Sequence, residues 1–287
     1  MKKILLASTA LVLSAGLASA QGLSISGQGR MGVQYNSTLA TTTRQENRLQ
    51  LNFNVSVEAD HGLTFGAYSR VRINNGVTGL FSGSRVWVEA NGLRLTFGNS
   101  DGALRGAGTA FGYAGGCGVG YEGGQQCGDS MGLLGVSQGF ASTGGGNAAM
   151  TRIDYTMGDT RVAVSHARLG ATEIGVRTSF NAWTVAAGYS NTGTGVTTVS
   201  AGYNGGSWAA GLGLARVAGV TNYVLQGSTN MGGGSVYGYI GRVAGSATYG
   251  LSYGYGLGGG ATLTVGAERN TAGAGTTTAS VGVAFNF

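Results

Sequence analysis

The segment from Arg48 to Glu58 alternates apolar and polar residues without interruption. One parity is wholly apolar and the other wholly polar: Leu49, Leu51, Phe53, Val55 and Val57 against Arg48, Gln50, Asn52, Asn54, Ser56 and Glu58. This period of two predicts a β-strand with one apolar and one polar face. The same alternation recurs at residues 23–35, 207–214 and 279–287. Beyond residue 20 no apolar run reaches the roughly 20 residues that a membrane helix needs.

The composition favours sheet and excludes several other classes of protein. The chain of 287 residues contains 58 glycines and no proline, so collagen-like and proline-rich disordered structures are excluded. Only 10% of the residues are charged and 42% are hydrophobic, unlike an intrinsically disordered chain. Proline removes a hydrogen-bond donor from a sheet, so its absence suits a chain made mostly of strands.

Residues 1–20 have the three regions of a secretory signal peptide. Lys2 and Lys3 precede an apolar run, and the small residues Ala18-Ser19-Ala20 form a cleavage pattern. The alternative is a buried N-terminal helix. Because both lysines lie in this segment, the mature chain would carry only arginines as basic side chains, 15 of them against 11 acids. This excess is too small to indicate nucleic-acid binding, and export would remove the chain from the cytoplasm.

Turn-forming residues divide residues 21–287 into sixteen predicted strands. Tight turns are expected at residues 60–62, 91–92, 158–159, 181–182, 204–206, 231–234 and 258–260. Longer breaks are expected at residues 36–46, 74–82, 98–148, 169–171, 190–195, 216–221, 243–247 and 270–276. Uniform turns on one side and longer, variable loops on the other are typical of an outer-membrane β-barrel. The sequence therefore predicts an all-β fold, a closed transmembrane antiparallel barrel; a water-soluble sandwich or solenoid is the alternative.

The first predicted strand carries the most specific resemblance to a known family. Residues 26–36 (SGQGRMGVQYN), 62–67 (GLTFGA), 95–99 (LTFGN) and the terminal Phe287 resemble the Gram-negative general porins of the Rhodobacter type. The resemblance covers essentially the whole mature chain. It implies a trimer of sixteen-stranded barrels, each an aqueous pore in the outer membrane narrowed by its third external loop. In that family the terminal aromatic residue is part of the outer-membrane assembly signal.

The break at residues 98–148 is far longer than the others and is expected to be functional. Side chains alone cannot fill the lumen of a sixteen-stranded barrel, so we expect this loop to fold inward as a constriction; projection into the medium is the alternative. The loop contains both cysteines, Cys117 and Cys127. We expect a disulfide in an exported chain, with two free thiols as the alternative. A metal site is not expected, because the loop has no histidine.

The polar parity places arginines and acids inside the predicted barrel, because charges facing lipid would cost roughly 2–4 kcal/mol each near mid-membrane. By strand position Arg30, Arg70, Arg72 and Arg94 match the basic wall of the resembled family. The constriction loop offers Asp101, Glu122 and Asp129 opposite them, together with Arg105. Because the loop offers only three acids against the four wall arginines, we expect a weak anion preference. Alternatively, these arginines and acids only neutralise one another.

The predicted function is passive diffusion of ions and small hydrophilic solutes across the outer membrane, without covalent chemistry or a cofactor. A substrate-specific channel and an adhesin are the alternatives; Trp87 and Tyr68 are the only clear aromatic candidates for the lumen, and only one loop is long. An outer-membrane protease or phospholipase is disfavoured, because His61 and His166 lie far apart and His166 has the outward parity. The glycine pattern at residues 118–123 matches a dinucleotide motif by chance in so glycine-rich a chain.

Overall fold

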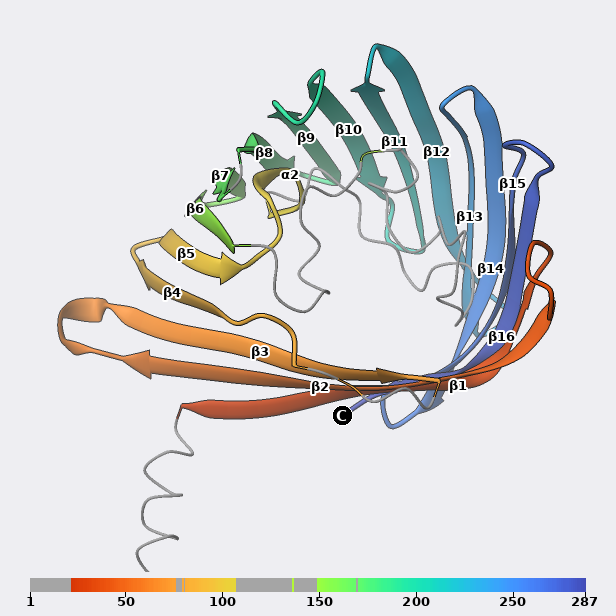
Figure 1. The fold of residues 1–287 in the computed structure, drawn as a ribbon, viewed down its shortest axis with the longest axis horizontal. Helices are drawn as coiled ribbons and strands as arrows, with labels where there is room; N and C mark the ends of the chain where they lie inside the picture. Colours follow the sequence, from red (N-terminus) through yellow and green to blue (C-terminus); the bar gives the residue numbers. More distant parts are fainter. Residues whose placement is uncertain (1–21, 76–78, 80, 107–135, 137–148, 169) are drawn as a thin grey trace, which may run out of the picture.

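Sixteen antiparallel strands close into a single barrel in a computed structural model that describes residues 22–75, 79, 81–106, 136, 149–168 and 170–287 (Figure 1). Each strand pairs with its neighbours in sequence, and β1 pairs with β16 to complete the ring. The strands are β1 (Leu23–Asn36), β2 (Thr43–Glu58), β3 (Thr64–Asn74), β4 (Arg85–Ala90), β5 (Leu93–Asn99), β6 (Ala149–Met157), β7 (Thr160–Ala167), β8 (Thr172–Phe180), β9 (Trp183–Ser190), β10 (Val196–Asn204), β11 (Trp208–Val217), β12 (Val220–Met231), β13 (Gly234–Val243), β14 (Ser246–Gly258), β15 (Ala261–Asn270) and β16 (Thr276–Asn286). The predicted fold class and strand count are confirmed.

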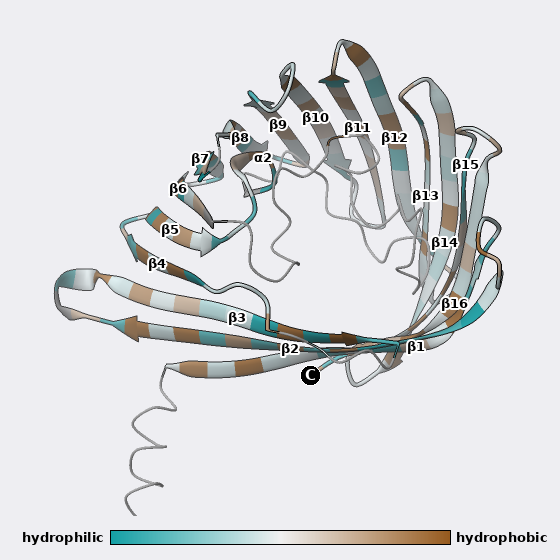
Figure 2. Ribbon diagram, in the orientation of Figure 1, coloured by the Kyte–Doolittle hydropathy of each residue, from teal (hydrophilic) through white to brown (hydrophobic). Residues whose placement is uncertain are grey.

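The outer surface of the barrel is apolar and the inner surface is largely polar, so hydropathy alternates along the strands in Figure 2. In β2, Leu49, Val55 and Val57 are 41%, 39% and 56% exposed on the outside. Their neighbours in sequence face the lumen, where side chains such as Glu46 are buried. The register predicted for this strand is confirmed. No helix within the described ranges is long and apolar enough to cross a membrane.

The connections fall on two rims, which differ as predicted except at two hairpins. Tight connections at one rim join β2 to β3, through the 3-10 turn η1 (Asp60–Gly62), and each later even strand to the next odd strand. At the opposite, loop rim, longer loops were expected at residues 216–221 and 243–247, but here the strands continue to within two residues of each other. These two expectations are wrong, because Ala218-Gly219 and Ala244-Gly245 both adopt positive φ and close two-residue hairpins.

Aromatic side chains mark the tight-turn rim on the outside of the barrel. Trp183 of β9 lies 5.0 Å from the ring centre of Tyr203 in β10, which in turn lies 5.1 Å from Trp208 of β11. Amphipathic aromatic rings are enriched where a membrane protein meets the interface between lipid and water. This row therefore indicates the level of one membrane surface.

The seam between β1 and β16 is closed by phenylalanine rings that lie over glycines. A Cβ atom on Gly27 would come within 2.2 Å of the Phe287 ring, and one on Gly29 within 2.1 Å of the Phe285 ring. Gly27 and Phe287 also exchange two backbone hydrogen bonds, of 2.7 and 3.1 Å. Larger residues at these two positions would displace the rings that cover the seam.

Candidate pore site

Five arginines form a continuous row on the lumen face of β1–β4, which we call the arginine ladder: Arg30, Arg48, Arg70, Arg72 and Arg85. Arg30 lies directly opposite Arg48 in the β1–β2 pair. Arg72 is opposite Gln50 and so diagonal to Arg48, and Arg85 is opposite Tyr68 and diagonal to Arg70. The row forms because arginine occupies inward positions on four consecutive strands, and the strand pairing brings these positions opposite or diagonal to one another.

Neutral side chains hold several guanidinium groups of the ladder in place. Arg30 Nε donates to Gln28 Oε1 (3.1 Å), and Arg72 Nε donates to Gln50 Oε1 (2.7 Å). Arg48 Nε donates to Asn74 Oδ1 at 3.1 Å, while the guanidinium of Arg85 stacks 4.1 Å from the Tyr68 ring centre. An amide oxygen carries no net charge, so these hydrogen bonds orient the guanidinium groups without cancelling their charge.

Arg94, the fourth arginine predicted for the basic wall, belongs to a second cluster of mixed charge. It stands near the tight-turn end of β5, pairs with Glu89 and lies 5.2 Å from the Trp87 ring centre. Further round the wall, Asp154 accepts from Arg152 at 2.8 Å and from Arg161 at 2.9 Å. This cluster therefore combines arginines with carboxylates in direct ion pairs.

The first residues of the long connection after β5 are anchored to the inner wall. The short helix α2 (Ala103–Gly106) lies inside the ring of strands beside β7 and β8 (Figure 1). The backbone N–H of Ala103 donates to Ser165 Oγ (2.8 Å), and that of Leu104 donates to Glu173 Oε2 (3.1 Å). Both acceptors are buried inward residues of β7 and β8, so the start of the connection runs inward.

Asp101 and Arg105, both predicted to be constriction residues, lie in this anchored stretch. Arg105 Nε is 3.6 Å from Asp101 Oδ2, and Arg152 Nη1 donates to the backbone oxygen of Asp101 at 2.8 Å. The Asp101 carboxylate therefore pairs with an arginine of its own segment, while the wall arginine Arg152 binds the Asp101 backbone.

An apolar patch on the lumen face of β10–β13 receives the long connection. Leu104 and Val136, both from that connection, are 2% and 3% exposed and pack in one buried cluster with five wall residues: Val196, Ala215, Val224, Tyr237 and Tyr239. The Tyr237 hydroxyl donates to Gln226 Oε1 (3.0 Å), and that of Tyr239 donates to Glu268 Oε2 (3.2 Å). Val136 is thus held inside the barrel, far in sequence from the anchored start.

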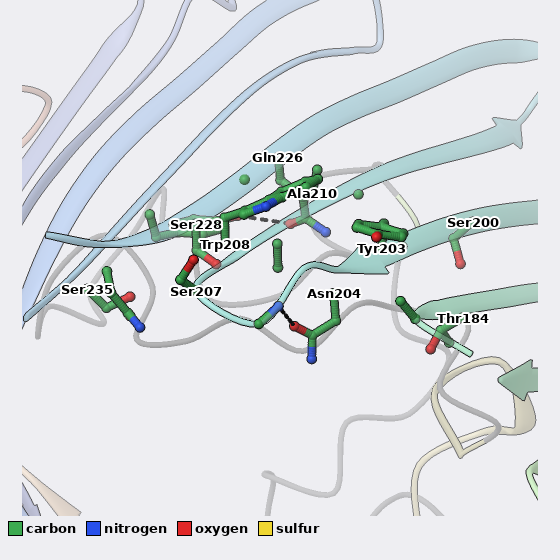
Figure 3. A pocket seen from close by; sticks show the side chains of 18 of the residues that line it. Thr184, Ser200, Tyr203, Asn204, Ser207, Trp208, Ala210, Gln226, Ser228 and Ser235 are labelled. Carbon is green, nitrogen blue, oxygen red and sulfur yellow. Dashed lines mark hydrogen bonds between the residues drawn. The ribbon is translucent and has the colours of Figure 1, made fainter. Parts of the chain in front are cut away.

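The rest of the lumen wall formed by β9–β14 has uncharged inward residues, and many of them are small. A hollow of about 460 Å³ lies against β9–β13 towards the tight-turn rim, where Figure 3 shows Thr184, Ser200, Gln226 and Ser228 around it with Tyr203 and Trp208 at its border. Glycine occupies many inward positions of this half, among them Gly188, Gly202, Gly211, Gly213, Gly254 and Gly256. Hydroxyls, amides and bare backbone form a hydrophilic wall on β9–β13, and Arg177 of β8 also lines the hollow.

Several predicted site residues lie outside the part of the chain that the structure describes. These are Cys117, Cys127, Glu122 and Asp129, together with residues 1–20. Sequence reasoning missed Tyr237 and Tyr239 as lumen aromatics beside Trp87 and Tyr68. A period-two reading of residues 234–243 could have found them, since both tyrosines share the parity of Ser235.

Within the described residues, no three His, Cys, Asp or Glu side chains are grouped so that they could hold a metal ion. His166 lies on the outside of β7, where its Nδ1 is 2.9 Å from Thr172 Oγ1. This outward position agrees with the parity assigned from the sequence.

A closed sixteen-stranded barrel with an apolar exterior and a polar, partly charged lumen defines a membrane channel. The sequence matches the family model described as Gram-negative porin over residues 7–284. The chain therefore belongs to the Gram-negative porin family, and it is a general diffusion porin of the outer membrane.

Solved structures support the fold. A mutant of Rh. blastica porin with five substitutions is 22% identical, with a TM-score of 0.73 over 92% of this chain and 100% of that one. A doubly substituted mutant of the same porin has a TM-score of 0.75, again at 22% identity, with 92% of this chain and 100% of that chain covered. No curated protein sequence matches the chain.

Proposed function

We propose that this porin passes ions and small hydrophilic solutes passively and favours anions weakly, without covalent chemistry. The arginine ladder carries the proposal, because it concentrates positive charge on one stretch of the lumen wall. At physiological salt the screening length is about 8 Å, so charges lining a narrow passage act on a permeating ion, whereas charges on the outer surface scarcely do.

The cost of the ladder supports a role in permeation. Like charges directly opposite each other in a sheet are destabilising, and Arg30 faces Arg48 in this way. Amide and aromatic partners, which carry no net charge, restrain guanidinium groups of the ladder. Arginine stays protonated at any physiological pH, so the resulting field is permanent.

We propose that residues 98–148 form the constriction of the pore. Support comes from α2, anchored on Ser165 and Glu173, and from Val136, which is buried in one cluster with Leu104 against the lumen face of β10–β13. Both points lie on the inner surface of the barrel, which supports an inward course for the connection between them. A disulfide between Cys117 and Cys127 would stiffen such a constriction.

We further propose that residues 1–20 are removed on export and that the mature chain forms a homotrimer. The first follows from the three regions of a signal peptide, and the second from the resemblance to general porins. Mass analysis of the exported protein, together with its molar mass in detergent, tests both.

A substrate-specific channel is less well supported. Aromatic residues could guide a sugar along a lumen, and four of those in the described strands face inward, but Tyr237 and Tyr239 are only 3% and 4% exposed. Their faces are covered and cannot stack on a passing solute. An adhesin would need several long external loops, whereas two loop-rim connections are only two residues long.

Reconstitution into a planar bilayer with a salt gradient tests the proposal. We expect a reversal potential of the sign that anion permeation gives, and linear conductance for simple salts. Cation selectivity of the wild-type pore at low salt would refute the anion preference while leaving the diffusion function standing.

A further inference from the structure

Three arginines face outward at the loop rim of the barrel, and we call them the outer arginine rim: Arg216, Arg242 and Arg269. Each is the last residue but one of its strand, β11, β13 or β15, and each is exposed. They belong to the parity that elsewhere on these strands carries Leu212, Ile240 and Val265 toward lipid.

The three arginines recur at equivalent places. Arg242 is directly opposite Tyr223, and Arg269 is directly opposite Tyr249, so two successive hairpins each present an outward Arg–Tyr pair. Successive arginines of the row are separated by two strands across the sheet and by two residues along the strand direction. Strand geometry converts this offset to a distance of about 12 Å between their Cα atoms. The arrangement is a row along the rim rather than a chance surface charge.

The side chains are held at the level of the strand ends. Arg242 Nε donates to the backbone oxygen of Gly245 (3.0 Å), and Arg269 Nη1 donates to Thr277 Oγ1 (2.8 Å). A guanidinium group has five N–H donors, so each keeps further donors for a ligand. The hairpins at Ala218-Gly219 and Ala244-Gly245 are the shortest possible, so no long loop rises over Arg216 and Arg242 at their own hairpins.

No carboxylate opposes these charges on their own face. Glu268 is the only acid between residues 208 and 286, and it points inward, where it is 6% exposed and accepts from Thr278 Oγ1 at 3.0 Å. Outward arginines near mid-membrane would be strongly destabilising, but the cost falls to about 0–1 kcal/mol near the interface. The rim therefore stands where the apolar wall meets the head-group layer.

We propose that the outer arginine rim binds phosphorylated lipid head groups in the outer leaflet, where the loops of a porin face the cell exterior. Arginine matches phosphate oxygens with its planar, forked donors. The tyrosines beside it place an aromatic body at the acyl boundary and a hydroxyl at the head group. The occupant fits because it offers phosphate above and acyl chains below, against the apolar wall under the rim.

The test uses the full mature protein in nanodiscs of neutral lipid doped with fluorescent diphosphorylated lipid A. In the triple variant Arg216→Gln, Arg242→Gln and Arg269→Gln we expect at least ten-fold weaker binding, since each arginine contributes about five-fold. The corresponding lysine triple should keep most of the binding, because lysine still supplies the charge. Unchanged single-channel conductance shows that each variant has folded.

The matched control removes three arginines from the inside of the same barrel: Arg48→Gln, Arg70→Gln and Arg72→Gln. We expect it to alter ion selectivity and leave lipid A binding unchanged. Equal binding by wild type and the outer triple would overturn the proposal, and so would an equal loss in the lumen triple.

Two further outcomes would also overturn it. Displacement of lipid A by an equal concentration of inorganic phosphate would show that the rim holds only a free anion. Loss of the oligomer with lipid A binding intact would show that the rim is a contact between copies of the chain. If the triple variant fails to fold, the single variant Arg242→Gln, with its smaller expected loss, decides the question.

Discussion

The lumen wall formed by β1–β8 is crowded with charges, whereas the wall formed by β9–β16 carries only Glu268 among its described inward residues. The first half presents the arginine ladder and the mixed cluster around Asp154. The second half presents hydroxyls, amides, glycine backbone and an apolar patch.

This difference separates two tasks that a narrow pore must perform. The charged half supplies a permanent field, and side chains that keep their charge cannot also form a dry contact with a loop. The neutral half supplies that contact, because Val196, Val224 and Tyr239 can bury apolar area against Leu104 and Val136. The long connection is thus anchored to one half by hydrogen bonds and to the other by packing.

The largest expected effect comes from weakening the packed contact. Leu104→Ala removes a side chain that is 2% exposed and should destabilise docking of the connection by about 2–5 kcal/mol. We expect noisier and higher single-channel conductance. Leu104→Met, which conserves volume, is the control and should behave like the wild type. Identical traces for wild type and Leu104→Ala would show that the neutral half does not hold the connection.

A somewhat smaller effect is expected at the seam where the two halves meet. Gly29→Leu would drive a side chain into the Phe285 ring and cost about 1–3 kcal/mol. We expect a lower yield of heat-stable barrel on refolding, with the conductance of the molecules that do close left intact. Gly256→Leu is the matched control, because a Cβ there meets nothing within 4 Å. Equal yields from the two variants would contradict the role of the seam glycines.

Removing charge from the ladder should change selectivity rather than stability. Arg70→Gln together with Arg72→Gln should lower the anion-to-cation permeability ratio by up to about five-fold per charge. A unit charge at 8 Å in water contributes about 0.5 kcal/mol, with opposite signs for the anion and the cation. The reversal potential measures this ratio. Arg242→Gln with Arg269→Gln removes the same charge from the outer surface and should shift it far less. Equal shifts would mean that net charge, and not position, sets selectivity.

The smallest effect is that of salt on the wild-type pore. At 1 M salt the screening length falls to about 3 Å, so the field of the ladder no longer spans the passage. We expect the anion preference to decline steadily between 0.1 M and 1 M salt in the same bilayer measurement. A preference that does not vary with salt would point to a binding site for anions in place of a diffuse field.

Much of this architecture could be predicted from period-two patterning. Arg30, Arg70, Arg72 and Arg94 all lie on the lumen face of their strands, since a one-residue shift in register would place each of them in lipid. Their part in a constriction stays a prediction. From the sequence alone, Arg94 is equivalent to the other three wall arginines. Its pairing with Glu89 depends on the short β4–β5 hairpin, a fact of register rather than of composition.

The apolar patch inside the lumen was not predictable in the same way. In β12 both Val224, inside, and Leu225, outside, are apolar, so alternation alone does not show that Val224 is 0% exposed. Its burial depends on Leu104 and Val136, which are distant in sequence. The two-residue hairpins were missed because alanine rarely adopts the positive φ of 48° and 49° seen at Ala218 and Ala244.

The glycine-lined half of the lumen has a consequence for how such a pore can diversify. A Cβ at Gly254 would meet only Thr262, at 3.5 Å, and one at Gly256 would meet no atom within 4 Å. A side chain gained at either position would project into open water and narrow the passage without disturbing a strand. Single substitutions at such glycines can therefore change the pore diameter in small steps. They would leave the strand pairing and the arginine ladder unchanged.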